Sequence, residues 1–265
     1  MAKRLISTVI GIAVLILVMA LRNVVVFNIA LTIVAIIGIH EFYSAFKNKE
    51  IKPVAIIGYI ATLGLLFINQ EYGKIKTILI MALPVILLLL FAKSVFSNMK
   101  TSFMDVLITL FGIIYIPFSL MFLTLTRQMD YGEYYVWLIL GGAWVTDSFA
   151  YLIGSKMGKH KFSKISPNKS IEGAIAGIIS CAIFYGIYTY YLNKAGLNLN
   201  YVEMIIVGTV ISIISQIGDL AASEIKRFCG IKDFGKIMPG HGGILDRFDS
   251  VIFVSIGYLV LLTLM

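Results

Sequence analysis

Residues 103–126 read FMDVLITLFGIIYIPFSLMFLTLT, a long run in which Asp105 is the only charged side chain. A bilayer core about 30 Å thick needs roughly 20 mostly apolar residues for each helical span, so this run is long enough to cross a membrane. Pro117 lies inside it, and membrane helices tolerate such breakers because neighbouring groups can satisfy the freed backbone. The stretch therefore predicts a transmembrane helix.

The rest of the chain repeats this pattern. Of its 265 residues, 59% are hydrophobic and 14% are charged, whereas a soluble domain has about 45–50% apolar and about 25% charged residues. We therefore expect an all-α, polytopic membrane helical bundle of about nine transmembrane helices. The predicted spans are 5–21, 24–42, 54–70, 77–97, 103–126, 134–155, 172–193, 202–222 and 248–265.

The distribution of positive charge predicts the orientation of these spans. The net charge of +8 would suggest nucleic-acid binding in a soluble protein, but in a membrane protein Lys and Arg mark the cytoplasmic loops. The N-terminus and every second predicted loop hold 17 of the 22 Lys and Arg residues. We expect a cytoplasmic N-terminus, a C-terminus outside, a multi-pass protein of the inner (cytoplasmic) membrane and no nucleic-acid partner.

The two halves of the chain differ in polar content. Residues 1–130 contain almost no ionisable groups within their predicted spans beyond Glu41 and Asp105 near span ends, and we interpret this part as a transmembrane scaffold. Residues 131–265 contain two long, polar, predicted cytoplasmic loops, 156–171 and 223–247. We expect one continuous membrane domain with its chemistry in residues 131–265.

Four aspartates lie in or beside the last predicted spans. An ionisable group inside a bilayer costs a few kcal/mol at least, so each one requires a function or a partner. The predicted topology places Asp147, Asp219, Asp246 and Asp249 on the cytoplasmic side. Carboxylates together with water and substrate phosphates are the usual ligands of Mg²⁺, so a magnesium site is one interpretation.

Ion pairing is the alternative interpretation of these aspartates. Asp219 precedes Lys226 and Arg227 on the same predicted helix, and Asp246 precedes Arg247. In that case the carboxylates would be satisfied structurally and would have no role in chemistry. The sequence leaves both interpretations open.

The loop before the last span is rich in glycine and positive charge. Glycines let a backbone approach an anion closely, and the start of the following helix offers free N–H groups. This composition suits a nucleotide triphosphate, although no Gly-Lys is followed by Ser or Thr, which makes a P-loop enzyme a poor match. The candidate binding residues are Lys232, Lys236, Gly240, His241, Gly242, Gly243 and Arg247.

The other polar loop ends in Ile165-Ser-Pro-Asn-Lys-Ser-Ile-Glu-Gly173. Ser166 and Ser170 can donate hydrogen bonds to phosphate, and Lys169 adds a positive charge just before a span. Ser170 is equally well placed as a helix N-cap, with Glu172 in the first turn. A substrate role and a capping role are both open for Ser170 and Glu172.

Several of these motifs together resemble a known family. The motifs are Ser223-Glu-Ile-Lys-Arg227, Lys232-Asp233 and Pro239-Gly-His-Gly-Gly-Ile-Leu-Asp-Arg-Phe-Asp249, preceded by Asp147-Ser-Phe-Ala-Tyr151, Gly154, Gly158 and 166–173. This pattern is similar to the signature of phosphatidate cytidylyltransferases (CDP-diacylglycerol synthases). The resemblance covers roughly residues 135–265, with Met238 where Ile or Leu is expected and Asn168 where members vary.

The resemblance implies an activity and a site. It implies a Mg²⁺-dependent nucleotidyltransferase, with K⁺ as a second candidate ion, which makes CDP-diacylglycerol from CTP and phosphatidate in phospholipid biosynthesis and forms a homodimer. The implied catalytic residues are Asp219, Asp246, Lys226, Arg227 and Arg247, with Asp219, Asp246, Asp249 and Asp147 as metal ligands. The implied substrate-binding residues are Ser166, Asn168, Lys169, Ser170, Ser223, Lys232, Gly240, His241, Gly242 and Gly243.

Two other functions remain open at this stage. A CTP-dependent polyprenol or phytol kinase would also bind a lipid, a metal ion and a nucleotide. It would transfer the γ-phosphate of CTP instead of the cytidylyl group. A secondary transporter would also explain acids and broken helices inside a membrane, although it predicts acids near the midplane of two repeated halves. Here the acids gather at one predicted surface, and no repeat is visible in the sequence.

Overall fold

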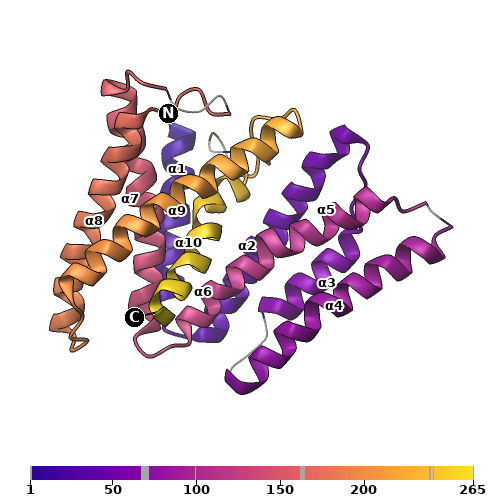
Figure 1. The fold of residues 1–265 in the computed structure, drawn as a ribbon, viewed down its shortest axis with the longest axis horizontal. Helices are drawn as coiled ribbons and strands as arrows, with labels where there is room; N and C mark the ends of the chain where they lie inside the picture. The colour runs from indigo at the N-terminus through magenta and orange to yellow at the C-terminus, as the bar shows by residue number, and fades with distance from the viewer. Residues whose placement is uncertain are drawn as a thin grey trace. The chain divides into compact units, whose positions relative to one another are not determined.

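The computed structural model describes residues 2–66, 72–98, 100–161, 165–238, 240 and 242–264. Within these residues the regular structure is helical apart from two isolated bridges (Figure 1), which confirms the all-α prediction. The α-helices are α1 (Ala2–Ala20), α2 (Val24–Ala45), α3 (Ala55–Leu66), α4 (Tyr72–Phe96), α5 (Phe103–Ile113), α6 (Ser119–Arg127), α7 (Gly132–Met157), α8 (Ile171–Lys194), α9 (Tyr201–Phe228) and α10 (Leu245–Leu264).

Six helical segments in the described part of the chain are long and apolar enough to cross a membrane. They are Val24–Lys49, Phe103–Arg127, Gly132–Met157, Ile171–Lys194, Tyr201–Phe228 and Leu245–Leu264. Shorter apolar helices occupy Val9–Ala20, Ala55–Leu66 and Met81–Phe96. The protein is therefore a multi-pass membrane protein by the length and composition of its helices, and the count of nine spans remains a prediction.

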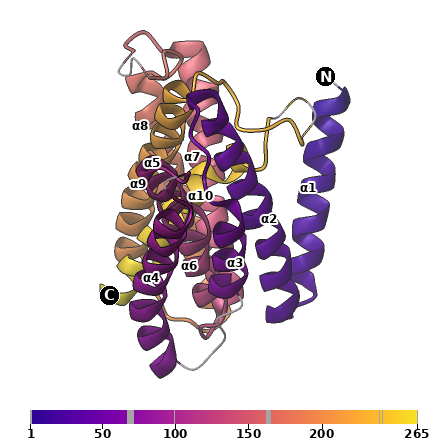
Figure 2. The same cartoon turned by 90° about the vertical axis from the view of Figure 1, so that its right-hand side faces the viewer.

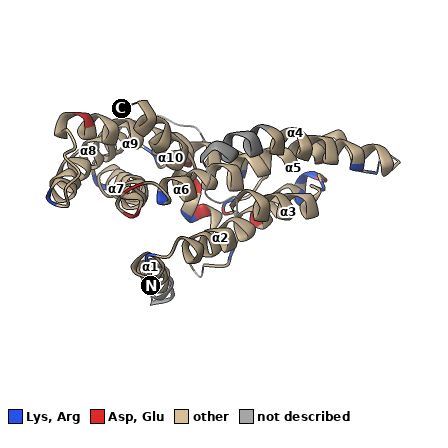
Figure 3. Ribbon diagram, turned by 90° about the horizontal axis from the view of Figure 1, so that it is seen from below, with Lys and Arg blue, Asp and Glu red and all other residues tan. Residues whose placement is uncertain are grey.

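The surface of α8 shows how these helices suit a lipid environment. Five isoleucines recur at every fourth position, so they share one helix face. Each is 46–57% exposed, and charged residues are sparse along the helices (Figure 3). A continuous exposed apolar face of this kind is rare on soluble monomers, whereas lipid tails would cover it. The residues are Ile171, Ile175, Ile179, Ile183 and Ile187.

The segment with Pro117 shows how the chain tolerates a breaker inside a span. Residues Ile114–Phe118 form a π-helical turn between α5 and α6, so the helix continues with one irregular turn. Proline has no N–H to donate. Within the same irregular turn, the Ser119 hydroxyl donates to the Ile114 carbonyl at 2.9 Å. Side-chain hydroxyls of this kind are one means by which membrane helices satisfy backbone groups in an irregular turn.

The chain forms two compact units, each containing a piece from late in the sequence. Unit 1 comprises Met1–Gln128 and Phe228–Arg247, and unit 2 comprises Met129–Arg227 and Phe248–Met265. In unit 1, α2 packs against α3, α5 and α6, and α1 lies along α2 (Figure 2). Unit 1 thus includes the segment 228–247 as well as the predicted scaffold.

Unit 2 is built on close contact between α7 and α8, which pack together over much of their length. Glycines make this approach possible. A Cβ atom added at Gly173 would lie 2.6 Å from the Ala150 carbonyl oxygen and 3.0 Å from the Gly154 Cα. Any larger residue at Gly173 would therefore push the two helices apart.

The helix ends differ from the predicted loop boundaries. The predicted loop 223–247 is shorter than expected, because α9 continues to Phe228 and α10 begins at Leu245. The four residues Gln216, Asp219, Ser223 and Lys226 therefore all lie on α9, at spacings that place them on one face.

Candidate active site

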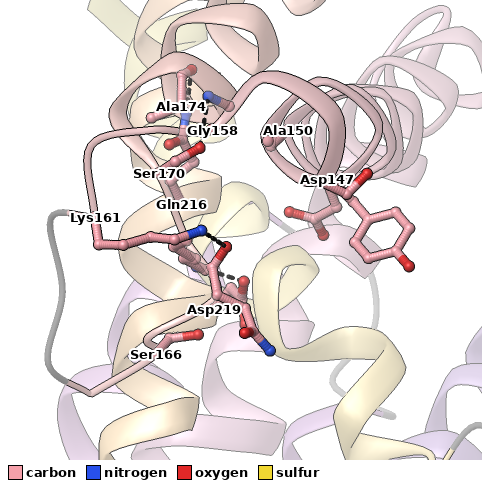
Figure 4. A pocket seen from close by; sticks show the side chains of 15 residues that line it. Asp147, Ala150, Gly158, Lys161, Ser166, Ser170, Ala174, Gln216 and Asp219 are labelled. Atoms are coloured by element: carbon pink, nitrogen blue, oxygen red, sulfur yellow. Dashed lines mark hydrogen bonds and ion pairs between the residues drawn. The ribbon is translucent and has the colours of Figure 1, made fainter.

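Unit 2 contains a pocket of about 550 Å³ at the cytoplasmic end predicted for α7 and α8 (Figure 4). It is lined by residues of α7, of α9, of the first turn of α8 and of the 158–170 loop that precedes α8. Ligand pockets commonly have volumes of about 300–1,000 Å³. The lining residues are Asp147, Ala150, Tyr151, Gly154, Ser155, Gly158, Lys161, Ser166, Asn168, Lys169, Ser170, Gly173, Ala174, Gln216 and Asp219.

An ion pair crosses this pocket. The Lys169 ammonium lies 2.5 Å from Asp219 Oδ2, and the two side chains are 23% and 31% exposed. The partial exposure leaves both groups accessible from the pocket that they line. Asp219 thus pairs with the lysine of the other polar loop, a partner that the sequence did not indicate for it.

Two further aspartates of unit 2 lie near this pair. The Ser250 hydroxyl donates to Asp147 Oδ2 at 3.0 Å. Asp249 is only 7% exposed and lies within electrostatic range of Asp219, Asp147 and Lys226. The structure thus brings Asp147, Asp219 and Asp249 into one acidic region of unit 2, with Lys169 and Lys226 as nearby cations.

The loop that carries Lys169 is held at its base by backbone contacts. The Ile171 N–H donates to the His160 carbonyl at 2.9 Å, and an antiparallel bridge joins Lys161 to Ser170. Ser170 accepts the Gly173 N–H at 3.2 Å, which confirms its predicted role as the N-cap of α8. The substrate role of Ser170 remains a prediction.

Glu172 and Arg227 both form hydrogen bonds with the backbone of the loop that contains Lys169. Glu172 accepts a hydrogen bond from the His160 N–H at 3.2 Å, and its Oε1 lies 2.6 Å from His160 Nδ1. The Arg227 Nε–H donates to the Ile165 carbonyl at 3.4 Å. Glu172 therefore serves the loop structurally, and Arg227 links the end of α9 to the start of the Ser166–Ser170 motif.

Unit 1 contains a second pocket, of about 620 Å³, formed by the glycine-rich loop and the start of α10. Three exposed cations and one acid line it, which favours an anionic ligand. Gly240 and Gly242 adopt positive φ angles of 80° and 84°, which favour glycine. The lining residues are Lys232, Asp233, Gly235, Lys236, Met238, Gly240, Gly242 and Arg247.

The Asp246 carboxylate organises this loop. Its Oδ2 accepts the Phe234 N–H at 2.8 Å and the Gly243 N–H at 2.9 Å, and the side chain is 8% exposed. Gly242 was expected to let the backbone approach a bound anion. A Cβ there would lie 2.9 Å from Asp246 Oδ2, so the closest anion to Gly242 is the protein's own carboxylate. His241 lies outside the described residues.

The predicted metal ligands are divided between the two units. Asp147, Asp219 and Asp249 belong to unit 2, and Asp246 belongs to unit 1. Among the described residues, no three His, Cys, Asp or Glu side chains are arranged to hold a metal ion. The donors are hard carboxylate oxygens, and Mg²⁺ commonly uses one or two carboxylates together with substrate phosphates, so the donor set fits an ion that binds with a nucleotide.

Several residues that line the pocket are not among the site residues predicted from the sequence, including Lys161, Tyr151 and Gln216. Lys161 is one of the positive residues of the predicted cytoplasmic loop 156–171, and Tyr151 is the last residue of the Asp147–Tyr151 motif. Gln216 donates to the Ala174 carbonyl at 3.2 Å, which links α9 to α8. Gln216 could have been predicted as a pocket residue, because it precedes Asp219 by three residues and therefore lies on the same helix face.

Comparison with known proteins identifies the family. The model of the cytidylyltransferase family matches residues 2–265, which is nearly the whole chain. This chain belongs to the cytidylyltransferase family. The match includes the first half, where the sequence motifs alone showed only a similar hydrophobic layout, so membership of the family extends to unit 1 as well.

This family member is also similar to curated bacterial proteins named phosphatidate cytidylyltransferase. The protein of Staphylococcus haemolyticus (strain JCSC1435) is 36% identical over 226 residues, which cover 84% of each chain. The protein of Staphylococcus aureus (strain COL) is 37% identical over 238 residues, or 88% of each chain. The resemblance inferred from the motifs is thereby confirmed, and the chain is a nucleotidyltransferase with several membrane helices.

Proposed function

We propose that this protein is a phosphatidate cytidylyltransferase, which converts CTP and phosphatidate into CDP-diacylglycerol and pyrophosphate. The observation that carries the proposal is the unit 2 pocket, where the Lys169–Asp219 pair and the hydroxyl groups of the Ser166–Ser170 motif line one cavity at the end of three membrane helices. Such a position suits a reaction between a water-soluble nucleotide and a lipid. The curated relatives carry the name of this activity.

The reaction joins two anions. A phosphate oxygen of phosphatidate attacks the α-phosphorus of CTP, a new P–O bond forms, and the bond to the β-phosphate oxygen breaks to release pyrophosphate. The attacking oxygen is already ionised near neutral pH, so no strong general base is required. The protein's main task is to neutralise and orient phosphate charge.

The cations of the two units have separate roles in this proposal. Lys169 and Lys226 of unit 2 hold phosphate oxygens and restrain their motion, with Ser166 and Asn168 as further polar contacts. Lys232 and Arg247 of unit 1 bind phosphate at the glycine-rich loop. Each contact is stronger when negative charge accumulates during the transfer than in the separate substrates.

We propose Mg²⁺ as the cofactor, as the family resemblance implies, and its candidate ligands are Asp219, Asp147 and Asp249 of unit 2 and Asp246 of unit 1. A bound divalent cation would neutralise phosphate charge at the reacting centre. The chain's own residues then fix the substrates' positions. K⁺ as a second ion and a homodimeric assembly rest on the family resemblance and are part of the same proposal.

The fate of the CTP phosphates tests the reaction class. Purified protein is incubated with phosphatidate, Mg²⁺ and CTP labelled separately at the α and γ positions. We expect the α label to enter the lipid fraction and the γ label to leave as pyrophosphate, because the attack occurs at the α-phosphorus. A reaction without phosphatidate is the control, and both labels are expected to remain in CTP there.

The same experiment identifies the competing activities. Transfer of the γ label into an added polyprenol would indicate a lipid kinase and contradict the proposal. Absence of turnover with any lipid phosphate, from protein shown to be monodisperse, would also contradict it.

The proposed topology places both pockets on the cytoplasmic side, where CTP is available. We expect a tag at the N-terminus or in the 156–171 loop to be protected in intact cells, and a tag after Met265 to be accessible from outside. The positive residues of the polar loops give the physical reason. Labelling of single cysteines with an impermeant reagent measures this, and external labelling in the 223–247 loop would contradict the site assignment.

A further inference from the structure

Glu41 is a buried acid in a part of the chain that the sequence assigned to scaffold. It lies near the end of α2 and is 4% exposed. A buried carboxylate is costly unless it is hydrogen-bonded or paired. Its Oε1 accepts the Ile244 N–H at 3.2 Å and its Oε2 accepts the Leu245 N–H at 2.9 Å.

These contacts cap α10 from a distant part of the sequence. The first N–H groups of a helix have no partner within it, and a negative charge at that end is favoured by the helix dipole. Glu41 supplies both the acceptors and the charge, across 204 positions of sequence from Leu245. Both partners belong to unit 1.

The loop before α10 is shaped around the same carboxylate. A Cβ atom added at Gly235 or Gly243 would fall on the Glu41 carboxylate, closer than any real contact. The neighbouring Phe42 ring packs against the Phe234 ring, with centroids 6.4 Å apart. Glu41 and Phe42 therefore hold both ends of the segment 234–245 against α2.

Asp246 completes this arrangement from the loop side. It accepts the Phe234 and Gly243 N–H groups, while Glu41 accepts those of Ile244 and Leu245. Four backbone donors are thus divided between two carboxylates. A shift of Glu41 would move the segment that contains Asp246 and Arg247, since Leu245 directly precedes these two residues in the sequence.

We propose that Glu41 is a positioning residue for the cytidylyl transfer, which sets the place of Asp246 and Arg247 by fixing the backbone of the glycine-rich loop. This inference rests on the proposed function for its catalytic part. Nothing in the sequence motifs indicates it, because Glu41 lies about 200 residues before the motif and outside the region of clearest resemblance.

Glu41→Gln tests the proposal with little change in size. An amide offers one oxygen acceptor and one NH₂ donor, so one of the two N–H groups would face a donor. A misplacement of about 1 Å can lower a rate about 10²-fold, and we expect kcat to fall at least about tenfold with the KM for phosphatidate changed by less than about twofold. Hydrogen exchange should rise in peptides covering 231–247 and stay unchanged elsewhere.

Two further variants make the result decisive. Glu203→Gln removes an exposed glutamate in the first turn of α9 and is expected to behave as wild type in every measurement. Gly235→Ala keeps Glu41 but crowds its carboxylate, so it is expected to reproduce the lower kcat and the local exchange. If Glu41→Gln is not monodisperse, Gly235→Ala decides by the same criteria.

The possible outcomes are separable. A wild-type protein that fails to transfer the α label would overturn the proposed function, while the exchange measurement would still report on the loop. An active wild type with a folded Glu41→Gln variant of unchanged kcat would overturn the positioning role. Reduced stability with normal turnover of the folded fraction would likewise show a purely structural cap.

Discussion

Asp219→Asn is expected to lower turnover by at least about 10²–10³-fold, the loss typical of removing one oxyanion-stabilising donor. The substitution preserves size but removes the charge that pairs with Lys169 in the unit 2 pocket. The Lys169 ammonium would then be free to adopt other positions, and hard cations bind an amide oxygen far more weakly than a carboxylate. Turnover of α-labelled CTP into lipid at saturating Mg²⁺ measures the effect.

The protein should remain folded in this variant. Asp219 is 31% exposed and lies within the regular helix α9, so an asparagine there adds no clash. Asp130→Asn, at an exposed position between α6 and α7, is the matched control and should retain full activity. A monodisperse Asp219→Asn protein with more than about a tenth of wild-type turnover, instead of the 10²-fold loss, would contradict the catalytic role.

Asp246→Asn is expected to cause a loss of similar size, at least about 10²-fold. The asparagine oxygen can still accept the Phe234 and Gly243 N–H groups that Asp246 now accepts, so the loop is expected to keep its shape. Only the negative charge is lost. Turnover and hydrogen exchange of the 231–247 peptides, measured on the same preparation, separate the loss of charge from the loss of structure.

Asp246→Ala provides the comparison that decides between the two roles of this residue. Alanine removes the acceptor, so the loop should loosen and activity should fall in either case. If Asp246 serves only as a structural acceptor, Asp246→Asn should be close to wild type and Asp246→Ala alone should be impaired. Equal, large losses in both variants with normal exchange in Asp246→Asn would establish that its charge is used in the reaction.

The helical membrane architecture could be predicted because it depends on local composition. Long apolar runs report directly on span length, and the polar sequence before Ile171 contained a recognisable N-cap in Ser170. The C-terminal end of α9 was harder to place, since four of the five residues in Ser223–Arg227 are polar and the helix continues through them beyond its apolar part. Composition separates lipid-facing from polar segments but does not show where a helix ends in water.

The types of residue in the candidate site could be predicted from the sequence, but the contacts between these residues could not. Lys169 was selected for its charge, yet its pairing with Asp219 depends on the packing of α8 and α9, which no spacing rule describes. Glu41 was noted only as an acid near a span end. Its donors lie more than 200 residues later, and contacts of that separation have no signature in a single sequence.

The bond between Glu41 and the start of α10 also bears on how the chain is made. A ribosome adds roughly 5–20 residues per second, so the 204 positions between Glu41 and Leu245 represent about 10–40 s of synthesis. For that period α2 is complete, but its carboxylate has neither of the N–H donors supplied by Ile244 and Leu245. Unit 1 therefore cannot reach its final structure when residues 1–128 have been made, and must wait for its second segment, 228–247, which is nearly the last to leave the ribosome.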